Sequence, residues 1–194
     1  MGLLNPMPQR ITRDLEPVLA LPDPRPKISS YHTMPYAIFR YDPAEEFALR
    51  AQVGLLQTRL EQRGKRVTRI SLAECLDVAM RSQRPLEEWF AAEREMGTDT
   101  VVDTVHAVLA EYTPLVDLVA ERMPANPDPL HDLVFILRTG ALFPVYRTFS
   151  RLEQLKGRVQ VPTVLFYPGD LEGASGLRFM GVLEAEHNYR PKIL

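Results

Sequence analysis

The chain has 194 residues, of which 45% are hydrophobic and 25% are charged, and its net charge is −2. This composition is typical of a soluble globular protein without an overall attraction to nucleic acid or to a membrane surface. The single cysteine, Cys75, excludes an internal disulfide, and no apolar run reaches the roughly 20 residues of a membrane helix, so we expect a cytoplasmic protein.

Prolines mark the first part of the chain, where seven of the 17 precede residue 36. We expect one short helix over residues 11–20. The alternate prolines between Pro22 and Pro26 fix an extended backbone, which excludes a helix or a central strand there. We therefore interpret residues 1–35 as an N-terminal arm, which either packs as a linker or reaches a partner. Residues 36–194 are expected to form a single α/β domain.

The first strand is predicted over residues 36–41, and Asp42 follows it as a helix cap. Pro43 suits the first helical position, and Gly64 ends the helix. The apolar stripe of this helix recurs every three or four residues, at Leu49, Val53, Leu56 and Leu60. A second strand is expected over residues 67–72.

A run of helices is predicted after the second strand. Residues 73–81 and 85–95 each carry helical patterns, and a further helix begins near Asp99. Pro114 breaks that helix, and the chain then begins another. These helices form an insertion between the second and third strands.

The central strand of the prediction is residues 133–137, because this short unbroken apolar run suits a strand that is buried on both faces. A polar turn, Arg138-Thr139-Gly140, follows it. Apolar residues then recur at helical spacing from Leu142 to Leu155, which predicts a helix. Further strands are expected over residues 161–167 and 177–183, with a turn at Pro168-Gly169-Asp170.

Strands that alternate with helices predict an α/β fold. We expect a mainly parallel sheet of about four to five strands with helices on both faces, similar to a degenerate nucleotide-binding fold.

The glycine-rich phosphate-binding loop that follows the first strand of a nucleotide-binding fold is missing from this sequence. Asp42-Pro43-Ala44-Glu45-Glu46 follows the first strand and has no glycine, and its three carboxylates would repel phosphate at a helix N-terminus. The central strand ends at Arg138, where a Walker B strand would end in an acid. We predict no nucleotide cofactor, and no ATP or GTP binding tighter than about millimolar.

Other catalytic patterns are also missing. The four histidines, His32, His106, His131 and His187, are scattered without metal-ligand spacing, and there is no Gly-x-Ser-x-Gly elbow. We therefore predict no catalytic and no metal-binding residue. Asp132, Asp170 and Lys156 keep a nuclease alternative open.

Positive charge is concentrated between residues 138 and 158, where five basic residues stand against Glu153 alone. Arg147 and Arg151 are four residues apart, which places them on one face of the predicted helix. Such a face can bind an acidic partner or phosphates, or can be an ordinary solvated surface. The turn from Tyr167 to Asp170 is either structural or the wall of a site.

Four motifs occur together in a fixed order. They are Tyr41-Asp42-Pro43 with Glu46 and Arg50, the segment from Asp132 to Pro144, Phe166-Tyr167-Pro168-Gly169, and Asn188-Tyr189-Arg190. In these motifs the chain, from residue 36 onward, resembles the BrxB family of BREX bacteriophage-defence systems. Leu171 and Pro191 depart from the family pattern, in which we expect aromatic residues.

The resemblance implies a non-catalytic adaptor in a defence complex. Its expected partner is a PglZ-type alkaline-phosphatase-like protein, with other BREX components beside it, DNA contacted only indirectly and no membrane contact. The alternative is a nucleic-acid-binding component, or a cryptic phosphoryl-transfer or nuclease component, that uses the Arg138–Arg158 face. The candidate partner-binding residues are Arg138, Arg147, Arg151, Tyr167, Asp170 and Arg190.

Overall fold

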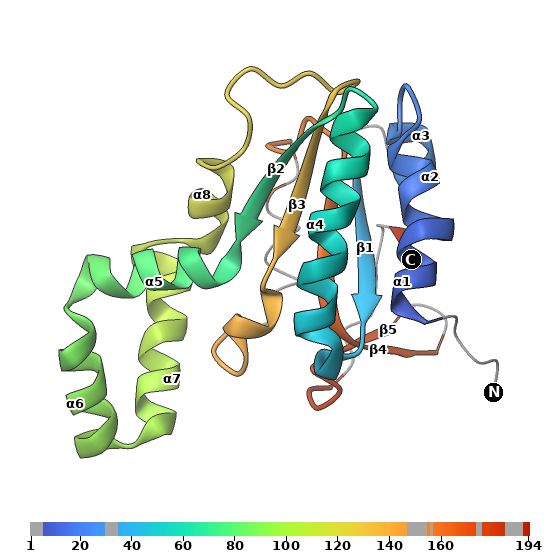
Figure 1. Ribbon diagram of the computed structural model, residues 1–194. Coiled ribbons are helices and arrows are strands. Elements are labelled where there is room, and N and C mark those ends of the chain that lie inside the picture. Colours follow the sequence, from blue (N-terminus) through green and yellow to red (C-terminus); the bar gives the residue numbers. More distant parts are fainter. Residues whose placement is uncertain (1–5, 30–34, 147–154, 156, 174–175, 185–191) are drawn as a thin grey trace.

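The computed structural model describes residues 6–29, 35–146, 155, 157–173, 176–184 and 192–194. In it a twisted sheet lies between two layers of helices (Figure 1). This arrangement confirms the predicted α/β class, with a mainly parallel sheet that is covered on both faces.

The sheet has the strand order β2-β3-β4-β1-β6. These five strands are all parallel to their neighbours, and β5 pairs with the far part of β4 in the antiparallel direction. The strands are β1 Tyr36–Tyr41, β2 Arg66–Ser71, β3 Asp132–Leu137, β4 Thr163–Glu172, β5 Gly176–Phe179 and β6 Lys192–Ile193.

The side chains of the central strands alternate between two hydrophobic clusters, as the pleat of a strand requires. Phe39, Phe135 and Phe166 point to one face. The centre of the Phe166 ring lies 5.6 Å from that of Phe39 and 5.5 Å from that of Phe135. Ile38, Ile136 and Leu165 are each next in sequence to one of these phenylalanines, and they point to the other face.

The first face is covered by the N-terminal helices and α4. These elements are α1 Met7–Arg10, a π-helical turn Ile11–Leu15, α2 Glu16–Leu19, α3 Arg25–Ile28, and α4 Glu46–Gln62 after a 3-10 turn Pro43–Glu45. The predicted stripe of α4 is confirmed, since Leu49, Val53, Leu56 and Leu60 are all buried.

The N-terminal residues belong to the hydrophobic core of this face. Met7, Ile11, Leu15 and Leu19 recur every four residues and are at most 2% exposed. The prediction that Pro22–Pro26 excludes a helix is wrong at its end, because α3 begins at Arg25. Proline is tolerated in a first helical turn, where its missing N–H has no intrahelical partner to lose.

The predicted insertion lies on the side of the second face and shares its hydrophobic cluster. It comprises α5 Leu72–Gln83, α6 Leu86–Met96, α7 Thr98–Ala107, a π-helical turn Val108–Tyr112, and α8 Leu115–Ala120. The helices α6 and α7 form an antiparallel hairpin that projects beyond α5, away from the sheet (Figure 1).

Two local predictions after β3 are wrong: the start of the helix near Leu142, and the turn at residues 168–170. A 3-10 helix, Thr139–Leu142, stands where the longer helix was expected to begin, and Phe143 is extended before a cis bond to Pro144. Residues 147–154 and 156, to which the predicted helix would extend, lie outside the described residues. Pro168-Gly169-Asp170 is not a turn but a part of β4, because Gly169 lets the backbone of β5 approach closely.

Candidate functional site

The carboxyl edge of a parallel sheet is where a ligand site usually lies. In open α/β sheets, ligands bind where the connections from neighbouring strands leave toward opposite faces. Here the chain leaves β1 toward the face of α4, whereas it leaves β3 toward the face of the insertion. The strand between them is β4, so the crevice of this sheet lies over the end of β4.

At the end of β1, side chains of the chain itself occupy the helix start. An oxygen of the Asp42 carboxylate accepts a 2.9 Å hydrogen bond from the backbone N–H of Ala44. The hydroxyl of Tyr41 donates to Glu46, whose second oxygen lies 2.9 Å from Nε of Arg50. The helix start therefore already has carboxylate partners from the chain itself.

Burial sets the protonation of Tyr41. Its ring is fully buried, and this burial, together with the bond to the Glu46 carboxylate, raises the pKa of the phenol far above its usual value. Tyr41 therefore stays a neutral hydrogen-bond donor at any physiological pH. This role is structural, since it joins the end of β1 to the first turn of α4.

The turn after β3 packs directly on β4. Arg138 has a left-handed conformation with φ of 60°, which turns the chain sharply. The hydroxyl of the fully buried Thr139 then donates a 2.7 Å hydrogen bond to the backbone oxygen of Phe166. A Cβ placed on Gly140 would lie 3.4 Å from Sδ of Met180 and 3.5 Å from Cγ of Pro168.

The crevice over β4 is filled by the hairpin of β4 and β5. β4 continues past the parallel sheet and returns as β5. The ring of Phe179 packs on Tyr167 at 5.3 Å and on Phe143 at 6.1 Å between ring centroids. Among the described residues, packed side chains therefore occupy the position between β3 and β4 at which related sheets hold a ligand.

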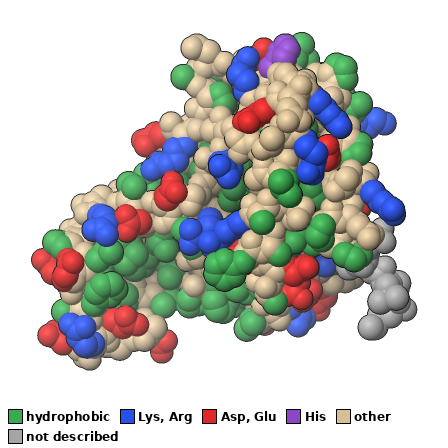
Figure 2. All heavy atoms as spheres, in the orientation of Figure 1, with side chains coloured by type: hydrophobic (Ala, Val, Ile, Leu, Met, Phe, Trp, Pro, Cys, Tyr) green, Lys and Arg blue, Asp and Glu red, His purple; other side chains and the backbone are tan. Residues whose placement is uncertain are grey.

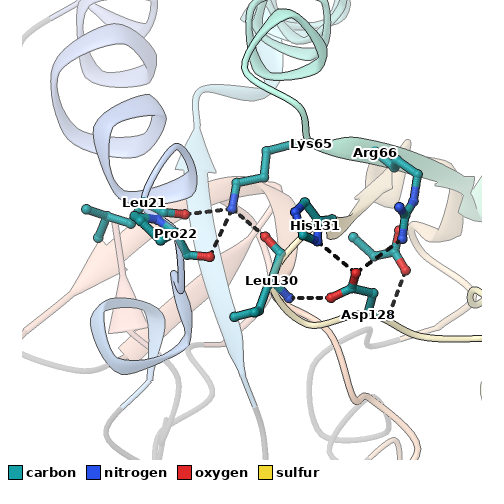
Figure 3. Close-up of polar contacts among 8 residues, drawn as sticks. Leu21, Pro22, Lys65, Arg66, Asp128, Leu130 and His131 are labelled. Carbon is teal, nitrogen blue, oxygen red and sulfur yellow. Dashed lines mark hydrogen bonds and ion pairs between the residues drawn. The ribbon is translucent and has the colours of Figure 1, made fainter.

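A polar cluster lies at the opposite, amino edge of the sheet (Figure 3). The ammonium of Lys65 donates to the backbone oxygens of Leu21, Pro22 and Leu130, at 2.6 to 3.3 Å. Burial lowers the pKa of Lys65. Because it joins the N-terminal segment to the loop before β3, we interpret Lys65 as a structural clamp.

Acidic side chains complete this cluster. Asp132 binds Nε of Arg66 at 2.7 Å and accepts from the backbone N–H of Asp128. Nδ1 of His131 lies 2.7 Å from the Asp128 carboxylate, and this hydrogen bond lowers the pKa of Asp128. Each carboxylate thus has protein partners, and the described residues contain no group of three His, Cys, Asp or Glu side chains that suits a metal ion.

A cavity of about 270 Å³ also lies near the amino edge, between the loop after α8 and the segment before β4. Its lining includes Glu121, Met123 and Arg158. Arg158 also forms an ion pair with Asp117 of α8. The guanidinium is thus held by the protein itself.

The structure separates the predicted site residues. Arg138 and Asp170 are exposed at the carboxyl edge, whereas Tyr167 is only 2% exposed and packs in the core. Arg138 follows the end of β3 and Arg158 precedes the start of β4, so the two described ends of the predicted basic face lie at opposite edges of the sheet. Arg147, Arg151 and Arg190 lie outside the described residues.

Sequence reasoning missed one feature. The hairpin of residues 86–112 carries seven acidic residues and one basic residue, and eight consecutive residues at its tip, 93–100, are exposed. A count of charge along this stretch would have found it.

The described residues contain no helix that is long and apolar enough to cross a membrane.

Known proteins bear out the resemblance in the sequence. The family model described as "BREX protein BrxB" matches residues 68–194. A protein of Bacillus cereus (strain H3081.97) with the same description is 27% identical over 157 residues, which cover 80% of each chain. No solved structure matches the chain significantly. The family match covers more than half of the sequence, and the chain therefore belongs to the BrxB family of the BREX bacteriophage-defence systems.

Proposed function

We propose that this BREX component is a non-catalytic adaptor that binds a PglZ-type alkaline-phosphatase-like protein of the same system. Through that protein it joins other BREX components in the cytoplasm and contacts DNA only indirectly. The observation that supports the proposal is the hairpin of β4 and β5, which fills the crevice over β4 with Tyr167 and Phe179. A sheet whose usual ligand position holds its own side chains is suited to binding through its surface.

The carboxyl edge offers exposed groups for such binding. Arg138 and Asp170 are exposed beside the closed crevice, and Leu171 next to Asp170 is 42% exposed. Charged side chains around an exposed apolar group are typical of the rim and core of a protein interface. Tyr167 contributes by holding the hairpin in place, since its ring lies below this surface.

The nucleic-acid alternative has less support. It needs several arginines on one face, because DNA binding depends on multiple phosphate contacts. The described members of that set, Arg138 and Arg158, lie at opposite edges, and Arg158 is paired with Asp117.

The test is capture of the PglZ-type protein by the full chain after co-expression. Arg138→Gly removes the exposed side chain and leaves the left-handed backbone conformation unstrained. We expect this variant to capture at least about tenfold less partner, because the loss of one charged contact costs about 2 kcal/mol or more. Arg69→Ala, which removes an exposed arginine of the edge strand β2, is the matched control and should capture as wild type does.

Two results would contradict the proposal. The first is a micromolar dissociation constant for ATP with magnesium, measured by calorimetry on the chain alone. The second is a gel shift of DNA by the chain alone, combined with no capture of the PglZ-type protein.

A further inference from the structure

The helical hairpin of α6 and α7 is the most distinct surface that the proposed adaptor role leaves unused. Its base is anchored by Trp89, which is 2% exposed and whose indole N–H donates a 3.1 Å hydrogen bond to the backbone oxygen of Met80. The guanidinium of Arg84 lies 4.7 Å from the centre of the Trp89 ring. The hairpin is therefore held firmly at one end, while its tip projects into solvent (Figure 1).

The fold does not account for the apolar side chains that this hairpin exposes. α6 has 11 residues and packs on α7, and it buries Trp89 and Ala92. Phe90 and Met96 of the same helix remain 52% and 55% exposed. Short helices in water are stabilised mainly by burying an apolar face, so exposed Phe and Met side chains on a short helix favour a docking surface.

The charge of the hairpin restricts what can dock. Residues 86–112 carry a net charge of −6, whereas the rest of the chain, with 22 basic and 18 acidic residues, carries +4. None of the seven acidic side chains forms an ion pair with a described residue. Figure 2 shows hydrophobic side chains on this projecting part, flanked by many acidic and few basic ones.

We propose that the α6–α7 hairpin is a docking surface for a partner protein segment that carries lysines and arginines around apolar residues. The apolar residues of the segment would cover Phe90 and Met96, and its basic residues would pair with the acidic rim. The surface repels nucleic acid, because the phosphates would face uncompensated carboxylates. Complementary charge speeds the encounter and selects the partner, and the buried apolar contacts hold the complex together.

This inference is separate from the proposed PglZ-type interaction, which uses the carboxyl edge of the sheet. Loss of PglZ-type capture with intact hairpin binding would reject the proposed function alone, and the reverse result would reject this inference alone.

The test uses a variant with two reversed charges, Glu95→Lys with Asp103→Lys. Glu95 lies in the last turn of α6, where a carboxylate opposes the helix dipole, so its reversal is not expected to destabilise the helix. The matched control is Asp14→Lys with Glu61→Lys, which changes the net charge equally on exposed residues of the other face. A third variant, Phe90→Ala with Met96→Ala, removes the apolar contacts and keeps the charge.

The probe is a labelled synthetic peptide of Lys and Leu, about 18 residues or five helical turns long, with a Glu and Leu peptide as the control of opposite charge. We expect the full chain to bind the basic peptide and not the acidic one. The hairpin variants should each bind about tenfold more weakly, which corresponds to about 1.4 kcal/mol. The matched control should bind as wild type does. Binding of wild type should weaken in about 1 M salt, where the Debye length is about 3 Å.

The complete defence system gives the second measurement. A system protein that co-purifies with wild type and with the matched control, but with neither hairpin variant, is the expected result. Equal peptide binding by all variants would overturn the inference. So would a dimer of the chain in gel filtration that the hairpin variants abolish, because the occupant would then be a second copy.

Discussion

The buried hydroxyl of Tyr41 donates a hydrogen bond to the carboxylate of Glu46, and this bond links the end of β1 to the start of α4. Glu46 also holds Arg50, which lies 4.9 Å over the ring of the exposed Phe47. Three residues of one sequence motif of the family resemblance, Tyr41, Glu46 and Arg50, are thus a single hydrogen-bonded chain. Their physical role is to fix the angle between the first strand and its helix.

Tyr41→Phe should lower the free energy of unfolding by about 1–2 kcal/mol at neutral pH, since it removes one hydrogen bond to a charged group. Urea denaturation measures this loss, provided that the slope of the unfolding free energy against urea concentration (the m-value) is the same for both proteins. Arg50→Ala is the comparison, because it leaves the Tyr41–Glu46 bond intact at the more exposed end of the same chain. An equal or larger loss in Arg50→Ala would show that the buried bond is not the important one.

The same pair gives a pH dependence. The pKa of tyrosine in the unfolded chain is about 10. In the folded protein, burial and the bond to Glu46 raise the pKa of Tyr41 above that value. The stabilisation is therefore complete below about pH 10 and falls as the pH rises above it. We expect the stability difference between wild type and Tyr41→Phe to shrink in that range, as measured by denaturation at a series of pH values. A difference that is constant with pH would contradict this assignment.

Lys65→Met tests the clamp at the amino edge (Figure 3). Lys65 is 6% exposed and donates to three backbone oxygens, at Leu21, Pro22 and Leu130. Methionine has similar length but no donor, so these oxygens lose their partner. We expect a loss of about 2–4 kcal/mol in unfolding free energy. Lys27→Met, at an exposed lysine of α3, should change it by less than about 0.5 kcal/mol.

Much of the fold could be predicted because its local patterns agree with its long-range packing. The apolar run at residues 133–137 is a buried strand, and the stripe from Leu49 to Leu60 is the inner face of α4. The spacing of Met7, Ile11, Leu15 and Leu19 carries the same signal, but the prolines nearby indicate an extended segment instead.

The remaining features depend on contacts between distant residues. No local pattern shows that β1 lies between β4 and β6, so that the chain passes over two strands to reach β2. The continuation of β4 through Pro168 and Gly169 depends on its pairing with β5, which a turn-like sequence conceals. The filled crevice follows from that pairing, and so the closed site was not predictable residue by residue.

Gly169→Ala tests the hairpin that fills the crevice. A Cβ at this position would lie 2.2 Å from the backbone oxygen of Arg178, which cannot move without breaking the pairing of β4 and β5. We expect a loss of about 2 kcal/mol or more, and faster trypsin cleavage at Arg178 as the hairpin opens. Gly54→Ala is the control, since nothing lies within 4 Å of its added Cβ in α4, and it should stabilise the chain by about 0.5–1 kcal/mol. Unchanged cleavage in Gly169→Ala would mean that the hairpin is not closed over the sheet.

Phe135→Ala tests the centre of the core. Phe135 is fully buried in β3 between two neighbouring strands, and its ring packs edge-on against Phe166 with 5.5 Å between centroids. Its truncation removes apolar contacts and leaves a cavity, so we expect a loss of about 3–5 kcal/mol in chemical denaturation. The matched control is Phe47→Ala, since Phe47 is 79% exposed and its ring lies 4.9 Å from the Arg50 guanidinium. That change should cost less than about 1 kcal/mol. Similar midpoints for the two variants would show that β3 is not a buried interior strand of the sheet.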